Sequence, residues 1–295
     1  MNKKTDLLQR FLLERAGVSG VLVKLEESWQ EVAERGEYAP AVHELLGEAL
    51  AATALLTGNI KLNGSLSIQL KSDGPVRLLF TECTDAGRLR GLAQTDTELP
   101  DRLSLFQLKS PLMAITIENA SSGQRYQGMV PVEQGTLSHL IEGYFIRSEQ
   151  LPTHIQLVCE GGKAAGLLLQ PLAQGGGIGD ADPDGWNRVK HLAATLTREE
   201  LTQLPVEEIL RRLFHEENAV LTDSRPLAFG CQCSRERVAA VLRNLGREEA
   251  EAAIQIDGRV EVTCEFCNSR YHFDRVDLAQ LFRDEPETPG STATH

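Results

Sequence analysis

The 295-residue sequence is poor in aromatic and basic residues and contains no long hydrophobic run. Aromatic residues make up 5% of the chain, and two of them are Trp. The 30 basic residues are outnumbered by 42 acidic ones, which gives a net charge of −12. This charge is spread evenly, at −4 in each of residues 1–173, 174–230 and 231–295. Because a uniformly acidic chain repels phosphate, a nucleic-acid partner is not expected.

No targeting or membrane-spanning segment is recognisable. Lys3 and Lys4 resemble the basic start of a signal peptide, but charged residues interrupt the stretch that follows them. The longest apolar stretch, residues 45–56, contains Glu48 and is too short to cross a bilayer. We therefore expect a soluble cytoplasmic protein with no membrane partner.

Hydrophobic residues make up 41% of the chain and charged residues 24%, as in ordinary globular proteins, and the length suggests about two domains. Residues 1–173 combine helix patterns with short alternating segments joined by turns. Helices are predicted from Pro40 to about residue 58 and over residues 137–145. Hairpins mixed with helices indicate an α+β domain. The predicted strands are residues 65–70, 76–83, 88–93, 113–118, 126–130, 155–159 and 167–170.

Residues 174–230 are predicted to be a metastable helical linker. A Gly-rich stretch opens this segment, and three short helices with apolar stripes follow over residues 186–214. The middle helix begins with a capping box formed by Thr197 and Glu200. Helices this short are marginal in water alone, so they must pack on something else. Their stripes are either ordinary domain packing or latent binding surfaces.

Residues 231–283 are predicted to form a small C-terminal module, and residues 284–295 a disordered tail. Ser234 can cap a helix that ends at Gly246. Residues 254–257 and 260–263 have the pattern of a hairpin arm, and residues 271–273 that of a returning strand. Large apolar residues are few here, so the module needs a covalent or metal crosslink for stability.

The six cysteines are unevenly placed. Cys83 and Cys159 lie alone on predicted strands and are expected to be small core residues. The other four form two close pairs near the C-terminus, and four thiolates are a ligand set that zinc prefers. We therefore predict one Zn²⁺ per chain. The alternatives are four buried or free thiols without a metal, and a mixed ligand set that includes Cys267 and His272. The predicted ligands are Cys231, Cys233, Cys264 and Cys267.

The spacing of the first pair, with one intervening residue, departs from the two C-x-x-C knuckles of an ordinary zinc ribbon. Each pair is close enough in sequence to form a local disulfide, although the tighter ring would be strained. Zinc would tie residues 231–233 to residues 264–267, whereas two local disulfides would release the metal and tie nothing distant together. A redox-silent structural zinc site is the alternative on this spacing alone.

Several segments resemble the heat-shock protein 33 family of redox-regulated holdase chaperones. The C-terminal signature is Cys231-Gln232-Cys233-Ser234-Arg235-Glu236-Arg237 followed by Cys264-Glu265-Phe266-Cys267-Asn268. Residues 143–150 and 161–170 resemble motifs of the family's N-terminal domain, and residues 213–217 resemble its linker. The resemblance covers nearly the whole chain.

This resemblance implies an ATP-independent chaperone, not an enzyme, that is inactive while reduced and zinc-bound. In the family, oxidation forms two neighbouring disulfides, releases zinc, unfolds the zinc module and the linker, and favours dimers. Carried over to this sequence, the disulfides are Cys231–Cys233 and Cys264–Cys267. The implied partners are unfolded or partly folded client proteins and a second copy of the chain, during oxidative and heat stress.

Two other functions fit parts of the sequence. A thiol–disulfide oxidoreductase would use Cys264 and Cys267 catalytically and would not need Cys231 and Cys233. A zinc-ribbon module for nucleic acid would use all four cysteines, but residues 231–295 carry a net charge of −4, which argues against it.

Overall fold

The computed structural model describes residues 6–96, 105, 108–132, 135–172, 182 and 184–283. The chain forms two compact units, residues 1–230 and 231–295. The linker predicted from the sequence packs within the first unit, although most of its Gly-rich start lies outside the described residues. The predicted disordered tail, residues 284–295, also lies outside them. Within the described part of the chain, no helix has the length and apolar character needed to cross a membrane.

The first unit contains a five-stranded antiparallel sheet, which we call the first sheet. Its strand order is β10-β1-β2-β9-β8. The outermost strand, β10, pairs with β1, although the two strands lie near opposite ends of the sequence of this unit. Sequence patterns predicted β8 and β9 but did not predict β1, β2 or β10. The strands are β1 (Leu7–Leu13), β2 (Val18–Leu25), β8 (His154–Glu160), β9 (Lys163–Pro171) and β10 (Ala219–Pro226).

A second, six-stranded sheet has the order β11-β5-β4-β3-β6-β7. All its pairs are antiparallel except the short pairing of β11 with β5. The predicted strands of the middle of the chain all lie in this sheet. They are β3 (Gly64–Lys71), β4 (Val76–Thr84), β5 (Arg88–Thr95), β6 (Leu112–Asn119), β7 (Arg125–Val130) and β11 (Ala228–Phe229).

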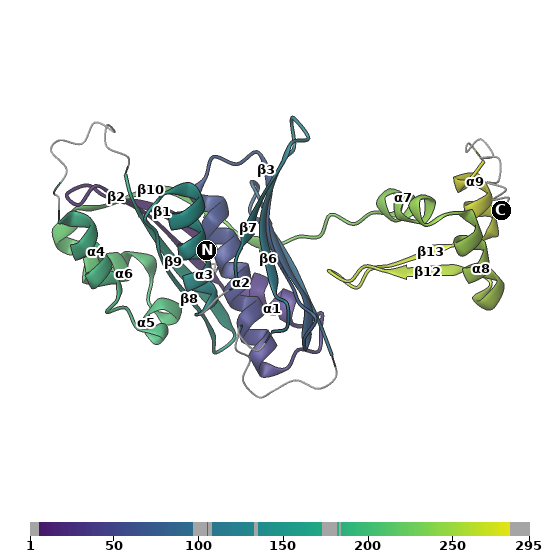
Figure 1. Cartoon of the computed structure of the whole chain (residues 1–295), viewed down its shortest axis with the longest axis horizontal. Helices are drawn as coiled ribbons and strands as arrows, with labels where there is room; N and C mark the ends of the chain where they lie inside the picture. The colour runs from purple at the N-terminus through teal and green to yellow at the C-terminus, as the bar shows by residue number, and fades with distance from the viewer. Residues whose placement is uncertain are drawn as a thin grey trace, which may run out of the picture. The chain divides into compact units, whose positions relative to one another are not determined.

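Helix α2 (Pro40–Asn59) lies between the two sheets and forms the main core with both (Figure 1). Pro40 at its first turn sets the start of the helix, and apolar residues on nearly all its faces are buried. Its Thr53 hydroxyl lies 2.6 Å from the Thr81 hydroxyl of β4, which satisfies both buried groups. The smaller elements are α1 (Glu27–Ala33), α3 (Leu137–Tyr144) and a π-helical turn (Phe145–Glu149). The α+β class predicted from the sequence is confirmed.

Three short helices cover the face of the first sheet that points away from α2 (Figure 1). These linker helices are α4 (Gly185–Ala193), α5 (Arg198–Gln203) and α6 (Val206–Phe214), and a 3₁₀ turn, His215–Glu217, follows them. The capping box of Thr197 and Glu200 forms as the sequence predicts. Phe214 stacks on Phe11 of β1, with ring centroids 6.3 Å apart. The central strands β2 and β9 of the first sheet are therefore buried on both faces.

The second unit packs three helices against a two-stranded hairpin around a small apolar core. Ser234 caps α7, as predicted. The extended segment predicted at residues 254–257 is wrong, because these residues end helix α8. The pattern of these residues suggested a hairpin arm, but the helix-forming residues before them continue the helix until Gly258, whose φ of 74° ends it. The elements are α7 (Arg235–Leu245), α8 (Arg247–Asp257), β12 (Val260–Thr263), β13 (Arg270–Phe273) and α9 (Arg275–Leu281).

We predict that the ion pair of Arg188 and Glu217 fixes α4 to the 3₁₀ turn that follows α6. Arg188 donates two hydrogen bonds, of 2.6 and 2.9 Å, to the Glu217 carboxylate, whose side chain is 1% exposed. Arg188→Ala leaves this carboxylate buried without its partner, which typically costs about 3–5 kcal/mol. Hydrogen exchange in α4 should therefore accelerate by more than ten-fold, and Arg188→Lys should have a smaller effect.

The same pair predicts a pH dependence. The hydrogen bonds from Arg188 lower the pKa of Glu217. The stability that the pair contributes is therefore complete above the ordinary Glu pKa of about 4.3 and is lost as the pH falls below it. Protection of α4, measured relative to the intrinsic exchange rate at each pH, that is independent of both Arg188 and pH would contradict this assignment.

Candidate functional site

Four cysteines converge at one end of the second unit. Cys231 and Cys233 lie immediately before α7, and Cys264 and Cys267 lie in the turn between β12 and β13. That turn closes tightly, because the backbone N–H of Cys264 donates to the carbonyl of Ser269 and that of Asn268 donates to the carbonyl of Cys264. The two sequence-distant pairs are thus brought together.

The spacing of the four sulfur atoms fits a tetrahedral metal ion. The Sγ atoms all lie within 4.8 Å of one another. Those of Cys231 and Cys264 are 3.6 Å apart, and those of Cys233 and Cys267 are 3.3 Å apart. Zinc–sulfur bonds of about 2.3 Å in a tetrahedron place the sulfurs about 3.8 Å apart. A small adjustment would therefore accommodate the ion, and the cluster fits a zinc-binding module.

Neighbouring polar groups point at the sulfur atoms. The Tyr271 hydroxyl donates a 3.1 Å hydrogen bond to the Sγ of Cys233, and this bond raises the pKa of Tyr271 to about 12. The Ser269 hydroxyl lies 3.2 Å from the Sγ of Cys267. Burial raises the pKa of Cys267, but hydrogen bonds from Ser269 and the neighbouring thiols outweigh it and bring the pKa to about 7. Such partners orient ligands and stabilise thiolates.

Two arginines of α7 hold the first cysteine pair in place. Arg237 donates a 2.8 Å hydrogen bond to the carbonyl of Gln232, the residue between Cys231 and Cys233. Arg235 donates to the carbonyl of His272 at 2.6 Å and forms an ion pair with Asp277 at 2.8 Å. These contacts connect the helix to the hairpin that carries the second pair.

The remaining candidate residues lie away from this cluster. The Nδ1 atom of His272, the alternative ligand, lies 3.3 Å from the carboxylate of Glu261. Successive residues of a strand face opposite sides of the sheet, and the neighbouring Tyr271 faces the sulfur atoms, so His272 faces away from them. Cys83 and Cys159 are buried in the first unit, and burial raises the pKa of each to about 12. They are core residues, as the sequence predicts, and their thiols are not activated.

A second site lies where the linker helices meet the first sheet. Arg198, the first residue of α5, forms ion pairs with three carboxylates, two on α2 and one on β8. Its guanidinium nitrogens lie 2.6 Å from Glu44, 3.2 Å from Glu160 and 3.7 Å from Glu48. Burial, followed by the Glu44 charge, raises the pKa of Glu48 to about 7. A single cation thus connects α5 to both α2 and β8.

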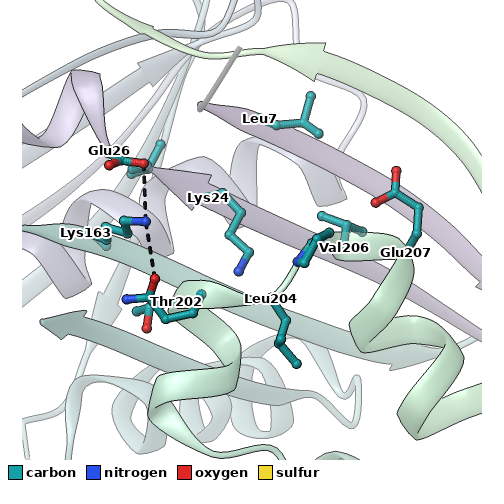
Figure 2. Close-up of a pocket in the computed structure, with 12 residues that line it drawn as sticks. Leu7, Lys24, Glu26, Lys163, Thr202, Leu204, Val206 and Glu207 are labelled. Carbon is teal, nitrogen blue, oxygen red and sulfur yellow. Dashed lines mark hydrogen bonds and ion pairs between the residues drawn. The ribbon is translucent and has the colours of Figure 1, made fainter. Parts of the chain in front are cut away.

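A cavity of about 310 Å³ lies at the junction of α5 and α6 with the first sheet (Figure 2). We call it the linker pocket. One wall comes from the sheet and includes Lys24 and Lys163, and the other comes from residues 202–207 of the linker. Lys163 contacts the carboxylate of Glu26 and the side-chain oxygen of Gln203, each at 3.4 Å. Lys24 donates a hydrogen bond to the carbonyl of Leu201 in α5.

Sequence reasoning did not single out Tyr271, Arg198 or Lys24. Tyr271 belonged to a predicted strand. Its place in the sequence between Cys267 and the core residue Phe273 was the available signal that its side chain lies near the sulfur atoms. Arg198 and Lys24 carried no local signal, because the groups they contact lie 38 to 177 residues away along the chain.

Comparisons with known proteins match the whole chain to one family. A family model described as Hsp33 protein matches residues 6–274. The 33 kDa chaperonin of Hahella chejuensis is 43% identical over 96% of this chain and 99% of its own length. That of Nitrosococcus oceani is 41% identical over the full length of both proteins.

A solved structure supports the same fold. The crystal structure of the 33 kDa chaperonin of Thermotoga maritima matches with a TM-score of 0.80 at 20% identity, over 95% of this chain and 98% of that one. The relatives are named as chaperonins rather than as enzymes. With a family model over residues 6–274 and relatives above 40% identity along nearly its full length, the chain belongs to the Hsp33 family of chaperones.

Proposed function

We propose that this chain is a redox-regulated, ATP-independent holdase of the cytoplasm. Its reduced, zinc-bound form is inactive, and its oxidised form binds unfolded or partly folded proteins and prevents their aggregation. The observation that carries the proposal is the cluster of four thiols, in which two pairs separated by 30 residues lie within 4.8 Å of one another. A crosslink made by thiolates is one that an oxidant can remove.

The proposal assigns a role to each part of the chain. Residues 1–173 form the chaperone core, residues 174–230 the metastable linker, and residues 231–283 the redox switch. Zinc, when bound, connects the two cysteine pairs and stabilises the small core of the switch. Structural zinc sites contribute about 10–16 kcal/mol of apparent folding free energy in small domains, which is comparable to the stability of a whole domain.

We predict one Zn²⁺ per reduced chain, held by Cys231, Cys233, Cys264 and Cys267. Metal analysis should find one equivalent, and a cobalt-substituted sample should show the absorption of four-thiolate coordination. Cys267→Ser should lose this spectrum, whereas His272→Ala should keep it because that ring faces Glu261. Less than half an equivalent of metal, or a spectrum of mixed nitrogen and sulfur ligation in the unmodified chain, would contradict the assignment.

We further predict local disulfides on oxidation, Cys231–Cys233 and Cys264–Cys267. Each disulfide forms as two thiols give two electrons and two protons to one peroxide molecule, which becomes two waters. The folded cluster does not select this pairing, because it also holds Cys231 near Cys264 and Cys233 near Cys267. The selection comes from chain entropy once the metal leaves, since closing the shortest loops costs least.

Peptide mapping without reduction distinguishes the two pairings. Fragments that contain one local disulfide each support the switch. A dominant crosslink between the two pairs would refute it, because that crosslink preserves the connection that zinc makes. Disulfide exchange with added dithiol substrates at Cys264 and Cys267 alone, with Cys231 and Cys233 dispensable, would instead support an oxidoreductase.

Chain connectivity suggests how loss of the crosslink reaches the linker. Cys231 follows Gly230, whose N–H donates a 2.8 Å hydrogen bond to the carbonyl of Leu89, and β11 before it consists of two residues. Strand β10, which precedes β11, is an edge strand with mostly exposed side chains. An unfolded switch is therefore connected along the chain, through the two residues of β11, to the edge strand β10 of the first sheet, and we propose that the linker helices detach from there.

Detachment would expose two apolar surfaces at once. The linker helices bury Val189, Ile209, Leu210 and Phe214, and the sheet beneath them buries Phe11, Leu13, Leu22 and Leu167. A contiguous apolar patch of this kind is a binding surface for unfolded chains. We propose it as the client-binding surface, and a dimer of oxidised chains as a means of enlarging it.

We predict that Leu210→Asp or Phe214→Asp produces chaperone activity in the reduced, zinc-bound protein. Both side chains are at most 4% exposed, so a charge there prevents docking. The measurement is light scattering of a thermally unfolding client, with hydrogen exchange over residues 186–217 in parallel. Leu221→Asp is the matched control, because Leu221 is 43% exposed in the same segment of the chain. If exchange shows an open linker and client aggregation is unchanged, undocking is not the activating step.

A further inference from the structure

The linker pocket contains a positive charge without a counter-ion. Lys163, on one side, is paired with Glu26. Lys24 reaches into the cavity (Figure 2). Its one hydrogen bond goes to the neutral carbonyl of Leu201. Among the residues that the structure describes, no carboxylate forms an ion pair with Lys24, and Glu207 lies well apart from it in Figure 2.

This arrangement is costly for the protein as it stands. Removing an ammonium group from water is unfavourable unless an opposite charge accompanies it. Burial, together with the nearby Lys163 charge, lowers the pKa of Lys24 to about 8. An anion at the Lys24 ammonium would remove this penalty, and it would form a charge-assisted hydrogen bond there.

The remaining walls define the rest of the ligand. Leu7 and Leu25 of the sheet and Leu204, Pro205 and Val206 of the linker give part of the cavity an apolar lining. Thr202, Gln203 and Glu207 line the rest of the linker wall. Its volume of about 310 Å³ equals that of about ten water molecules at roughly 30 Å³ each. One anionic group beside an apolar lining matches a small molecule with a carboxylate head and a short hydrocarbon tail.

We propose that the linker pocket binds a monocarboxylate with a short apolar tail, and that its occupant holds the linker helices on the first sheet. The sheet and the linker each supply one wall, so the site exists only while the linker is docked. A ligand that binds only one form shifts the equilibrium toward it, by about ten-fold at ten times its dissociation constant. This regulatory consequence rests on the proposed function, whereas the binding itself does not.

The test uses the reduced, zinc-bound full chain and octanoate, which has ten non-hydrogen atoms. Titration calorimetry should find one site that binds octanoate about ten-fold more tightly than the neutral octanamide, the difference expected for one charge-assisted hydrogen bond. Acetate, which lacks the tail, should bind more weakly than octanoate. Lys24→Gln should abolish the preference for octanoate over octanamide, and Lys24→Arg should retain it. Lys71→Gln, at an exposed lysine of the second sheet, is the matched control and should bind as the unmodified chain does.

Hydrogen exchange gives a readout that does not depend on affinity alone. At ten times its dissociation constant, octanoate should slow exchange in α5 and α6 by about ten-fold, and it should leave Lys24→Gln unaffected at the same concentration. Equal binding of octanamide, or binding that Lys24→Gln leaves unchanged, overturns the proposal. Faster exchange in α5 and α6 also overturns it, because the ligand would then prefer the apolar surface of the open form.

The outcomes separate this proposal from the proposed function. Octanoate that binds through Lys24 and slows exchange, in a protein whose oxidised form fails to prevent aggregation, supports the pocket and refutes the chaperone switch. Aggregation that is prevented after oxidation, together with no detectable binding of octanoate, refutes the pocket and leaves the switch intact.

Discussion

The apolar contact between the linker helices and the outer face of the first sheet is the interaction on which the rest of this structure depends. Strands β2 and β9 are buried on both faces, by α2 on one side and by α4–α6 on the other. The linker helices have 9, 6 and 9 residues, so each is too short to persist in water. Their helical structure therefore depends on the sheet, and the outer face of the sheet stays dry because of them.

Polar contacts at the edges of this interface determine where the helices dock. Arg198 connects α5 to three carboxylates, Arg188 connects α4 to the buried Glu217, and Lys24 binds the end of α5. These polar contacts are fewer than the apolar side chains buried between the linker helices and the first sheet, and each polar contact depends on a specific geometry. In our proposal this interface is specific while closed and opens when the zinc-bound switch no longer supports it, as expected of an element of low local stability.

Local features were predictable from the sequence, and long-range ones were not. Thr197 with Glu200, and Ser234 before α7, form the caps that their local patterns indicate. The two cysteine pairs were visible because each is a short motif. Strand β10 was missed because its side chains are mostly exposed and its partner, β1, lies at the other end of the unit. The contacts of Arg198, Lys24 and Tyr271 required the fold, since their partners are distant in sequence.

Simultaneous measurement of zinc release and hydrogen exchange during oxidation tests the central claim most directly. The reduced chain is treated with peroxide at mildly elevated temperature, and zinc release is followed with a colorimetric chelator at each time of exchange. We expect protection in α4, α5 and α6 to disappear in proportion to the zinc released, while α2 and the central strands β2 and β9 remain protected. Complete release of zinc with the linker helices still protected would contradict the account, because docking would then not depend on the metal.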